Sequence, residues 1–158
     1  MGVVNYGLYK VKDEYFIRFK NKYFSDNKSE NRPYYFSFMD KDGIIWFIPL
    51  SSQVDNYRQK INKTIADKGK CLFYFIDKIH GEDRVFLIGN MFPITENYIS
   101  GEYTYSNVHY VVKNTKTIKE ISKRAKKFLS LVKYGKLKPN INILEIKDEL
   151  LNTMTLPI

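Results

Sequence analysis

Two neighbouring side-chain hydroxyls, those of Ser51 and Ser52, are the first candidates for chemistry in this sequence. They follow an apolar segment, residues 43–48, whose β-branched and aromatic composition predicts a strand. They precede residues 54–65, where apolar side chains recur at the three- and four-residue steps of a helix. Because backbone N–H groups at a helix start attract phosphate, we expect this strand-to-helix junction to hold a phosphate group of RNA.

A local structural role is the alternative for both hydroxyls, and the sequence of the junction taken by itself favours it. Ser52 and Asp55 have the spacing of a loose capping box, which predicts that Ser52 caps the helix while Ser51 only turns the chain. Pro49 precedes the two serines. Since proline has no backbone N–H, it fits the last position of a strand or an edge strand, and not a central position.

Other familiar reactive patterns are absent from the sequence. It has no Gly-rich phosphate loop and no Ser-His-Asp signature, and neither His80 nor His109 has a second His or Cys at metal-ligand spacing. Acidic residues at 40–42 and 82–83 fall in predicted hairpin turns, where they are ordinary turn formers. We therefore expect no metal and no cofactor, and a phosphodiesterase that holds Mg²⁺ through these carboxylates remains an alternative.

The composition is that of a globular chain of one domain, residues 1–158. It is 44% hydrophobic and 27% charged, which excludes intrinsic disorder, and a single cysteine, Cys71, excludes an internal disulfide framework. We find no signal peptide and no run close to the roughly 20 apolar residues of a membrane helix. We expect a cytoplasmic protein with no membrane partner.

The net charge of +9 indicates a polyanionic partner such as a nucleic acid. The excess of positive charge is uneven, and a basic stripe lies in the C-terminal third, as expected for a surface that neutralises several phosphates. For any single lysine, a solvated helix face is the alternative. The lysines predicted to contact RNA are Lys116, Lys119, Lys123, Lys126 and Lys127.

The predicted elements make an α+β domain: a small, strongly curved antiparallel sheet with helices packed against it. Helical spacing resumes at Ser106 and continues to Val132, with a possible break at Asn114–Thr115, and Asn140–Leu144 is a candidate edge strand. A helical tail is expected at 148–152. The other predicted strands are 6–11, 33–39, 43–48, 71–76, 84–89 and 98–105, and the other predicted helices are 14–23 and 54–65. A strand is the alternative for 14–23, because its residues are aromatic.

Three segments, taken in order, resemble a known family. They are Arg32-Pro33-Tyr34 leading into a hairpin that ends Ile48-Pro49-Leu50-Ser51-Ser52, the segment Gly89-Asn90-Met91-Phe92-Pro93-Ile94, and the basic helical region after Tyr105. The set is similar to the toxins of type III toxin–antitoxin systems, the ToxN/AbiQ-like endoribonucleases, and especially to their CptN branch. The resemblance covers nearly the whole chain.

The resemblance implies a compact, highly twisted, barrel-like antiparallel sheet surrounded by helices, as in mRNA-interferase toxins. It also implies sequence-specific, metal-independent cleavage of cellular mRNA, in which the 2′-OH attacks the adjacent phosphate and leaves a 2′,3′-cyclic phosphate. The partner it implies is a repeat-derived pseudoknot RNA antitoxin, which the toxin cuts from a precursor and holds in a closed hetero-oligomeric protein–RNA assembly. Such systems often protect bacteria against phage.

The family's functional positions match this sequence unevenly. The hydroxyl pair after Pro-Leu matches Ser51 and Ser52, the aromatic residue of the first helix matches Tyr15, and the basic residue before the second strand matches Arg32. Many relatives have a lysine two or three residues beyond the hydroxyls, where this chain has Gln53 and Val54. A non-catalytic nucleic-acid-binding module is the alternative function. Candidate cations for the scissile phosphate are Arg32, Arg58, Lys60 and His80, and Tyr34 is a further RNA-binding candidate.

Overall fold

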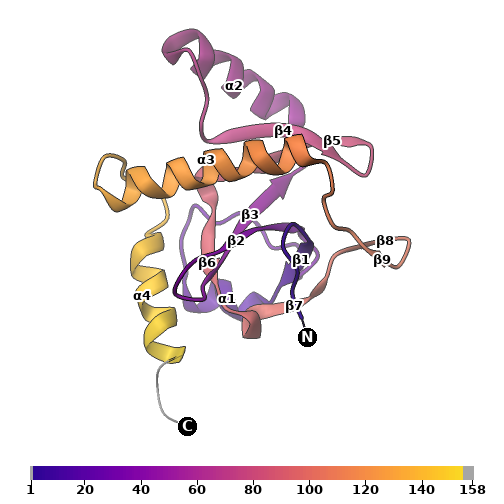
Figure 1. The fold of residues 1–158 in the computed structure, drawn as a ribbon, viewed down its shortest axis with the longest axis vertical. Coiled ribbons are helices and arrows are strands. Elements are labelled where there is room, and N and C mark those ends of the chain that lie inside the picture. Colours follow the sequence, from indigo (N-terminus) through magenta and orange to yellow (C-terminus); the bar gives the residue numbers. More distant parts are fainter. Residues whose placement is uncertain (1, 155–158) are drawn as a thin grey trace.

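The computed structural model describes residues 2–154, which form an α+β domain with an antiparallel sheet of seven strands and four α-helices (Figure 1). The predicted fold class is thus confirmed at this level. The strands are β1 Leu8–Val11, β2 Tyr34–Met39, β3 Ile45–Ser51, β4 Tyr74–Ile79, β5 Glu82–Leu87, β6 Phe92–Ile94 and β7 Ile99–Glu102, with a separate hairpin of β8 Thr104–Tyr105 and β9 Val108–His109. The helices are α1 Asp13–Arg18, α2 Val54–Lys68, α3 Thr115–Lys133 and α4 Ile143–Met154.

The sheet is open and runs in the order β4-β5-β3-β2-β1-β7, with β6 paired to β3 beside this path. Strand β3 changes its neighbour along its length: Ile45–Phe47 pair with β6, and Leu50 and Ser51 pair with β5. Pro49 lies between these two pairings, opposite Tyr34 on the β2 side. The next residue, Leu50, donates its N–H to Pro33 on that side. Pro49 therefore faces the gap between β6 and β5, where its missing N–H removes no hydrogen bond from the sheet.

The core is a block of packed aromatic rings, some stacked and others tilted or edge-on, that the curved strands enclose. The rings of Tyr9 and Tyr34 lie 6.0 and 6.3 Å from that of Phe47, both nearly parallel to it, and Tyr15 lies 5.1 Å from Phe92. The pairing of β2 with β3 shifts register between Phe36 and Phe38, and a β-bulge of this kind increases the bend of a sheet. Much of the aromatic content thus lies inside the protein.

Helix α3 crosses the sheet in Figure 1, and its buried residues repeat at steps of three and four along one face. Asn114 caps it by accepting hydrogen bonds from the N–H groups of Lys116 and Thr117. The prediction of helix from Ser106 was therefore wrong over its first nine residues. Ser106 and Asn107 take positive φ, 51° and 64°, and form the turn between β8 and β9, which places His109 in a strand.

Other segments also differ from prediction. Helix α1 ends at Arg18, five residues before the predicted end, and β4 begins at Tyr74 instead of Cys71. The predicted strand at 98–105 is divided between β7 and β8. The expected edge strand at 140–144 is absent, since Ile143 begins α4. Within residues 2–154, no helix combines the length and apolar character that a membrane crossing needs.

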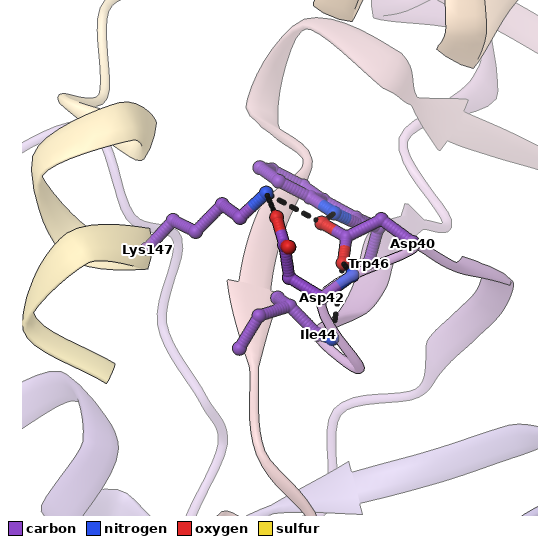
Figure 2. A network of polar contacts seen from close by, with 5 residues as sticks. All are labelled: Asp40, Asp42, Ile44, Trp46 and Lys147. Atoms are coloured by element: carbon purple, nitrogen blue, oxygen red, sulfur yellow. Dashed lines mark hydrogen bonds and ion pairs between the residues drawn. The ribbon is translucent and has the colours of Figure 1, made fainter. Parts of the chain in front are cut away.

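Helix α4 is joined to the β2–β3 hairpin by one lysine (Figure 2). The Lys147 Nζ lies 2.9 Å from Oδ2 of Asp40 and 2.9 Å from Oδ2 of Asp42. Asp40 also accepts hydrogen bonds from the indole N–H of Trp46 and from the N–H groups of Asp42 and Ile44. The carboxylates that the sequence left open as Mg²⁺ ligands at 40–42 are thus engaged by an ammonium group and by the turn itself.

Candidate functional site

The junction of β3 and α2 presents one occupied hydroxyl and one exposed hydroxyl. Ser51 is the last residue of β3 and is 9% exposed, and its Oγ accepts a 3.1 Å hydrogen bond from the N–H of Gln53. The predicted capping box is wrong, because α2 begins at Val54 and its N-cap is Gln53, which makes no side-chain cap. Ser52 lies outside the cap on the surface, and within residues 2–154 its hydroxyl has no hydrogen bond.

Arg32 lies beside this junction because of the register of β2 and β3. Tyr34 pairs with Pro49, and the N–H of Leu50 then donates to the carbonyl oxygen of Pro33 at 3.2 Å. Arg32 lies two residues before Tyr34, beyond the last pair of this register, and its own N–H donates to the carbonyl oxygen of Asn27. The backbone thus brings Arg32 into the neighbourhood of Ser51, which is nineteen positions away in the sequence, while the guanidinium itself contacts Asp26.

The guanidinium of Arg32 is buried without a carboxylate. The residue is 7% exposed, and its Nη1 donates a 3.1 Å hydrogen bond to the carbonyl oxygen of Asp26. Within residues 2–154, Nε has no hydrogen-bond partner and the side chain forms no ion pair. Taking a cation out of water costs free energy unless an anion or several hydrogen bonds compensate. This arginine therefore provides positive charge that the protein leaves largely uncompensated.

The cations of α2 lie on the same part of the surface but already have contacts. Arg58 Nη2 lies 3.3 Å from the carboxylate of Asp83, and Lys78 Nζ lies 2.8 Å from it. The hydrogen bond from Lys78 and the charge of both cations keep the pKa of Asp83 below its usual value. Lys60 sits 4.8 Å from the centre of the Tyr57 ring. Asp83 is two residues from Val85, the partner of Ser51 on β5, so Arg58 is held near the junction.

Five predicted RNA-binding lysines lie on one exposed face of α3, which we call the lysine face. At 100° per residue they fall within an arc of about 100°, opposite the buried residues of the same helix. None of them forms an ion pair within the part of the chain that the structure describes. The face consists of Lys116, Lys119, Lys123, Lys126 and Lys127.

The β4–β5 ribbon separates the lysine face from the junction. Side chains at alternate positions of β4 point to opposite faces. Tyr74 faces α2, where its ring lies 4.9 Å from that of Tyr57. Phe75 and Asp77 face α3, through Arg124 stacked 4.9 Å above Phe75 and a 2.7 Å hydrogen bond from Thr117 to Asp77. The two predicted RNA-binding regions are thus on different sides of the ribbon.

Two predicted functional tyrosines belong to the core, and this contradicts their predicted roles. Tyr15 is fully buried, and its hydroxyl donates a 2.7 Å hydrogen bond to the carbonyl oxygen of Pro93. Tyr34 is buried too, and its hydroxyl donates to Oδ1 of Asn27 at 2.9 Å. Burial raises the pKa of both phenols well above its usual value. No RNA base can stack on these rings, so both residues serve packing.

His80 is exposed, but it lies at the tip of the β4–β5 hairpin. Its ring is stacked on that of Tyr105 at 4.2 Å, and its backbone N–H donates a 2.8 Å hydrogen bond to the hydroxyl of Tyr110. His80 lies five positions before Val85, and the three steps from Glu82 to Val85 alone span roughly 10 Å along β5. His80 is therefore too distant to contact a phosphate held at Ser51.

Sequence reasoning missed the residues that connect α2 to α3. A cavity of about 390 Å³ lies between α2 and β4, and a second of about 320 Å³ lies beside α3. Lys70, Cys71 and Arg124 line both. In the sequence, Arg124 is only one more basic residue of a basic segment. At 100° per residue, Arg124 lies between the lysine face and the buried face of α3, and this position on the helix is the feature of the sequence that could have identified it.

Comparison with models of known protein families gives no match for this chain, and comparison with curated proteins gives none either. Within residues 2–154, no three His, Cys, Asp or Glu side chains are grouped as they would be to hold a metal ion.

Proposed function

We propose that this protein is an endoribonuclease that cleaves RNA at the β3–α2 junction, and that it is the toxin of a type III toxin–antitoxin system. One observation carries the proposal: buried Arg32 has no carboxylate partner among residues 2–154, and its backbone lies near Ser51, because the adjacent residues Pro33 and Leu50 are hydrogen-bonded. A phosphodiester is the anion that such a cation would bind beside two hydroxyls. The excess of positive charge on the chain supports a polyanionic substrate.

In the proposed reaction the 2′-OH of the RNA attacks the neighbouring phosphorus, and the 5′-oxygen leaves. The products are a 2′,3′-cyclic phosphate and a free 5′-OH. Arg32 balances the additional negative charge of the transition state, and the hydroxyl of Ser52 donates to a non-bridging oxygen. Ser51 fixes the turn through its oxygen and keeps its own O–H as a donor. Arg58 is the cation that replaces the lysine absent at Gln53 and Val54, after exchanging Asp83 for phosphate.

The proposed antitoxin is a repeat-derived pseudoknot RNA bound to the lysine face of α3. Five exposed lysines with no ion pair among the described residues would release counterions from such an RNA. Because the β4–β5 ribbon separates this face from the junction, an RNA that contacts both must pass around the edge of β4. That geometry suits a closed protein–RNA assembly, in which one segment is bound while another is cut. We place this assembly in the cytoplasm.

The barrel-like form expected from mRNA-interferase toxins belongs to the same proposal. Strands β6, β3, β2, β1 and β7 follow one another in an arc, and residues 95–98 connect β6 to β7. The chain therefore joins the two ends of the arc, although the strands there are not hydrogen-bonded to each other in the sheet order. An arc joined in this way supports the resemblance to small RNA-cutting toxins.

The decisive experiment is incubation of the purified protein with cellular RNA in EDTA, followed by chemical mapping of the new ends. We expect cleavage with 2′,3′-cyclic phosphate and 5′-OH ends. Cleavage that EDTA abolishes would support the metal-dependent phosphodiesterase instead. Short tandem repeats directly upstream of the gene would independently favour the toxin assignment.

The second candidate is a nucleic-acid-binding protein without catalytic activity. The bond between the Ser51 hydroxyl and the N–H of Gln53 favours it, because this serine already has a structural role at the junction. In this case the same incubation would give tight, salt-sensitive binding and no new RNA ends.

A further inference from the structure

Strand β4 forms one end of the sheet and has an edge suited to pairing with another chain. It pairs with β5 over six consecutive residues without a register shift. Within residues 2–154, no strand pairs with its outer edge. Proteins commonly protect such edges with proline, a bulge or several charges, whereas the first half of β4, Tyr74–Ile76, is aromatic and β-branched. This half of the edge resembles a template for strand addition.

The geometry of the hairpin identifies the backbone groups on this edge. His80 and Gly81 both have positive φ, 51° and 79°, as in a two-residue turn of type I′. The closing pair, Ile79 and Glu82, then exchanges hydrogen bonds within the hairpin, and every second residue of β4 points its N–H outward. The N–H of Lys78 is one of these outward groups, and it donates to the Asp77 side chain and not to β5. The outward N–H groups in the first half of β4 are thus those of Tyr74 and Ile76.

The cavity beside this edge has apolar side chains at its base and cationic side chains around its opening, which we call the rim. The cavity of about 390 Å³ includes Tyr74–Ile76 and, on α2, the side chains of Ile61 and Ile65. Helix α2 has no fully buried residue, and Ile65 is 46% exposed. Three cations surround these apolar residues: Lys70, which forms no ion pair within residues 2–154, Arg58, which is paired with Asp83, and Arg124, which is paired with Glu120.

We propose that the outer edge of β4 binds an extended, acidic segment of a partner protein as an additional strand. Backbone hydrogen bonds to Tyr74 and Ile76 would fix its register, alternate apolar side chains would cover Ile61 and Ile65, and carboxylates between them would meet the rim. A second copy of this chain does not fit, because its own rim cations would approach these like charges. RNA would satisfy the cations, but it has no strand edge to pair and would leave the apolar base uncovered.

The probe is a peptide of alternating glutamate and valine, about eight residues long, compared with a peptide in which lysine replaces glutamate. Binding is followed by fluorescence anisotropy, and amide hydrogen exchange is followed by NMR. We expect only the acidic peptide to bind and to slow exchange at Tyr74 and Ile76. Exchange at Phe75, whose N–H points to β5, should change little. No binding of the acidic peptide, equal binding of the lysine peptide, or binding without protection at Tyr74 and Ile76 would overturn the proposal.

Two substitutions separate charge from backbone pairing. Lys70→Glu should weaken binding roughly tenfold or more, whereas Lys63→Glu, the same charge change at an exposed residue of α2 outside the cavity, should have little effect. Ile76→Pro removes an outward N–H and should abolish binding. A single-stranded RNA that protects the same amides while the peptide does not would assign the groove to nucleic acid and refute the proposal. None of these readouts depends on RNA cleavage, so the proposed function stands or fails separately.

Discussion

Arg32 and Ser51 lie near one another, because the adjacent residues Pro33 and Leu50 are hydrogen-bonded, and their side chains differ in how far their polar atoms are satisfied. Ser51 accepts the N–H of Gln53, whereas Nε of Arg32 has no partner in residues 2–154. Ser51 therefore maintains the junction, whereas Arg32 is costly to bury. It leads directly to opposite expectations for stability and activity at the two positions.

Arg32→Met should reduce RNA cleavage roughly 100- to 1000-fold, because the charge that stabilises the transition state is removed. The free energy of unfolding should stay unchanged or rise, since an apolar side chain replaces a poorly compensated buried cation. Urea unfolding and single-turnover cleavage measure the two effects. Arg18→Met, which removes hydrogen bonds to Tyr98 and Thr153 away from the junction, is the control and should leave cleavage intact. Strong destabilisation with normal cleavage would show that Arg32 is structural.

Ser52→Ala should lower cleavage by a similar factor of about 100 to 1000 and leave the melting temperature unchanged, because its exposed hydroxyl has no hydrogen bond among the described residues. Ser51→Ala should also cost stability, about 1 kcal/mol, through loss of the bond to Gln53. Both effects can be measured on the same preparations. If the Ser51→Ala, Ser52→Ala double variant cleaved RNA as fast as the unsubstituted protein, neither hydroxyl would take part in the reaction.

Tyr15→Phe should destabilise the protein by about 1–3 kcal/mol and leave cleavage per folded molecule unchanged. The substitution leaves the buried carbonyl oxygen of Pro93 without its donor. Tyr23→Phe, at an exposed ring, should alter neither property. If Tyr15→Phe instead lost cleavage at normal stability, the packing role assigned to this tyrosine would be incorrect.

The Lys147 ion pairs should give stability over a defined pH range. Asp40 is partly desolvated, but hydrogen bonds from Trp46 and Lys147 and from the turn outweigh this and lower its pKa below 3.8. Partial burial disfavours the Lys147 ammonium, yet Asp42 and Asp40 raise its pKa above 10.5. Because the carboxyl pKa is lowered, Asp40 contributes stability above about pH 4, and this contribution is lost as the pH falls. Because the ammonium pKa is raised, Lys147 contributes stability below about pH 10, and this contribution is lost as the pH rises.

Lys147→Met should therefore lower the free energy of unfolding by about 1 kcal/mol near neutral pH. The difference from the unsubstituted protein should shrink below about pH 4, where the carboxylates bind protons. Urea unfolding at several pH values tests this, with Lys20→Met at an exposed residue as the control. A difference that stayed constant across acidic pH would show that α4 is attached by packing and not by charge.

Substituting glutamine for Lys119, Lys123 and Lys126 together should flatten the salt dependence of RNA binding. Each phosphate contact contributes about 0.7 to the slope of log K against log salt for a single strand, so three lost contacts reduce it by about 2. The triple substitution of Lys20, Lys22 and Lys41, which are exposed elsewhere, should leave the slope unchanged. If the unsubstituted protein and both triple variants gave equal slopes, the lysine face would not bind RNA and would be only a solvated surface.

The sequence was sufficient where a short-range pattern decides the outcome. The turn at Asp42–Gly43 and the hairpin of β2 and β3 were predicted, as was the helix that follows the two serines. The lysines of α3 share one face because their helical spacing alone determines it. These features depend on backbone propensity and on periodicity, both of which are local properties of the chain.

Tertiary structure alone decided which aromatic residues are buried and which distant residues meet. Aromatic residues in strands and amphipathic helices are mostly core, but a minority stack RNA bases, so spacing did not show to which group Tyr15 and Tyr34 belong. The neighbourhood of Arg32 and Ser51 depends on strand register, and a shift of one residue would turn each side chain to the other face of the sheet. Register is fixed by the packing of the whole sheet, which no local segment specifies.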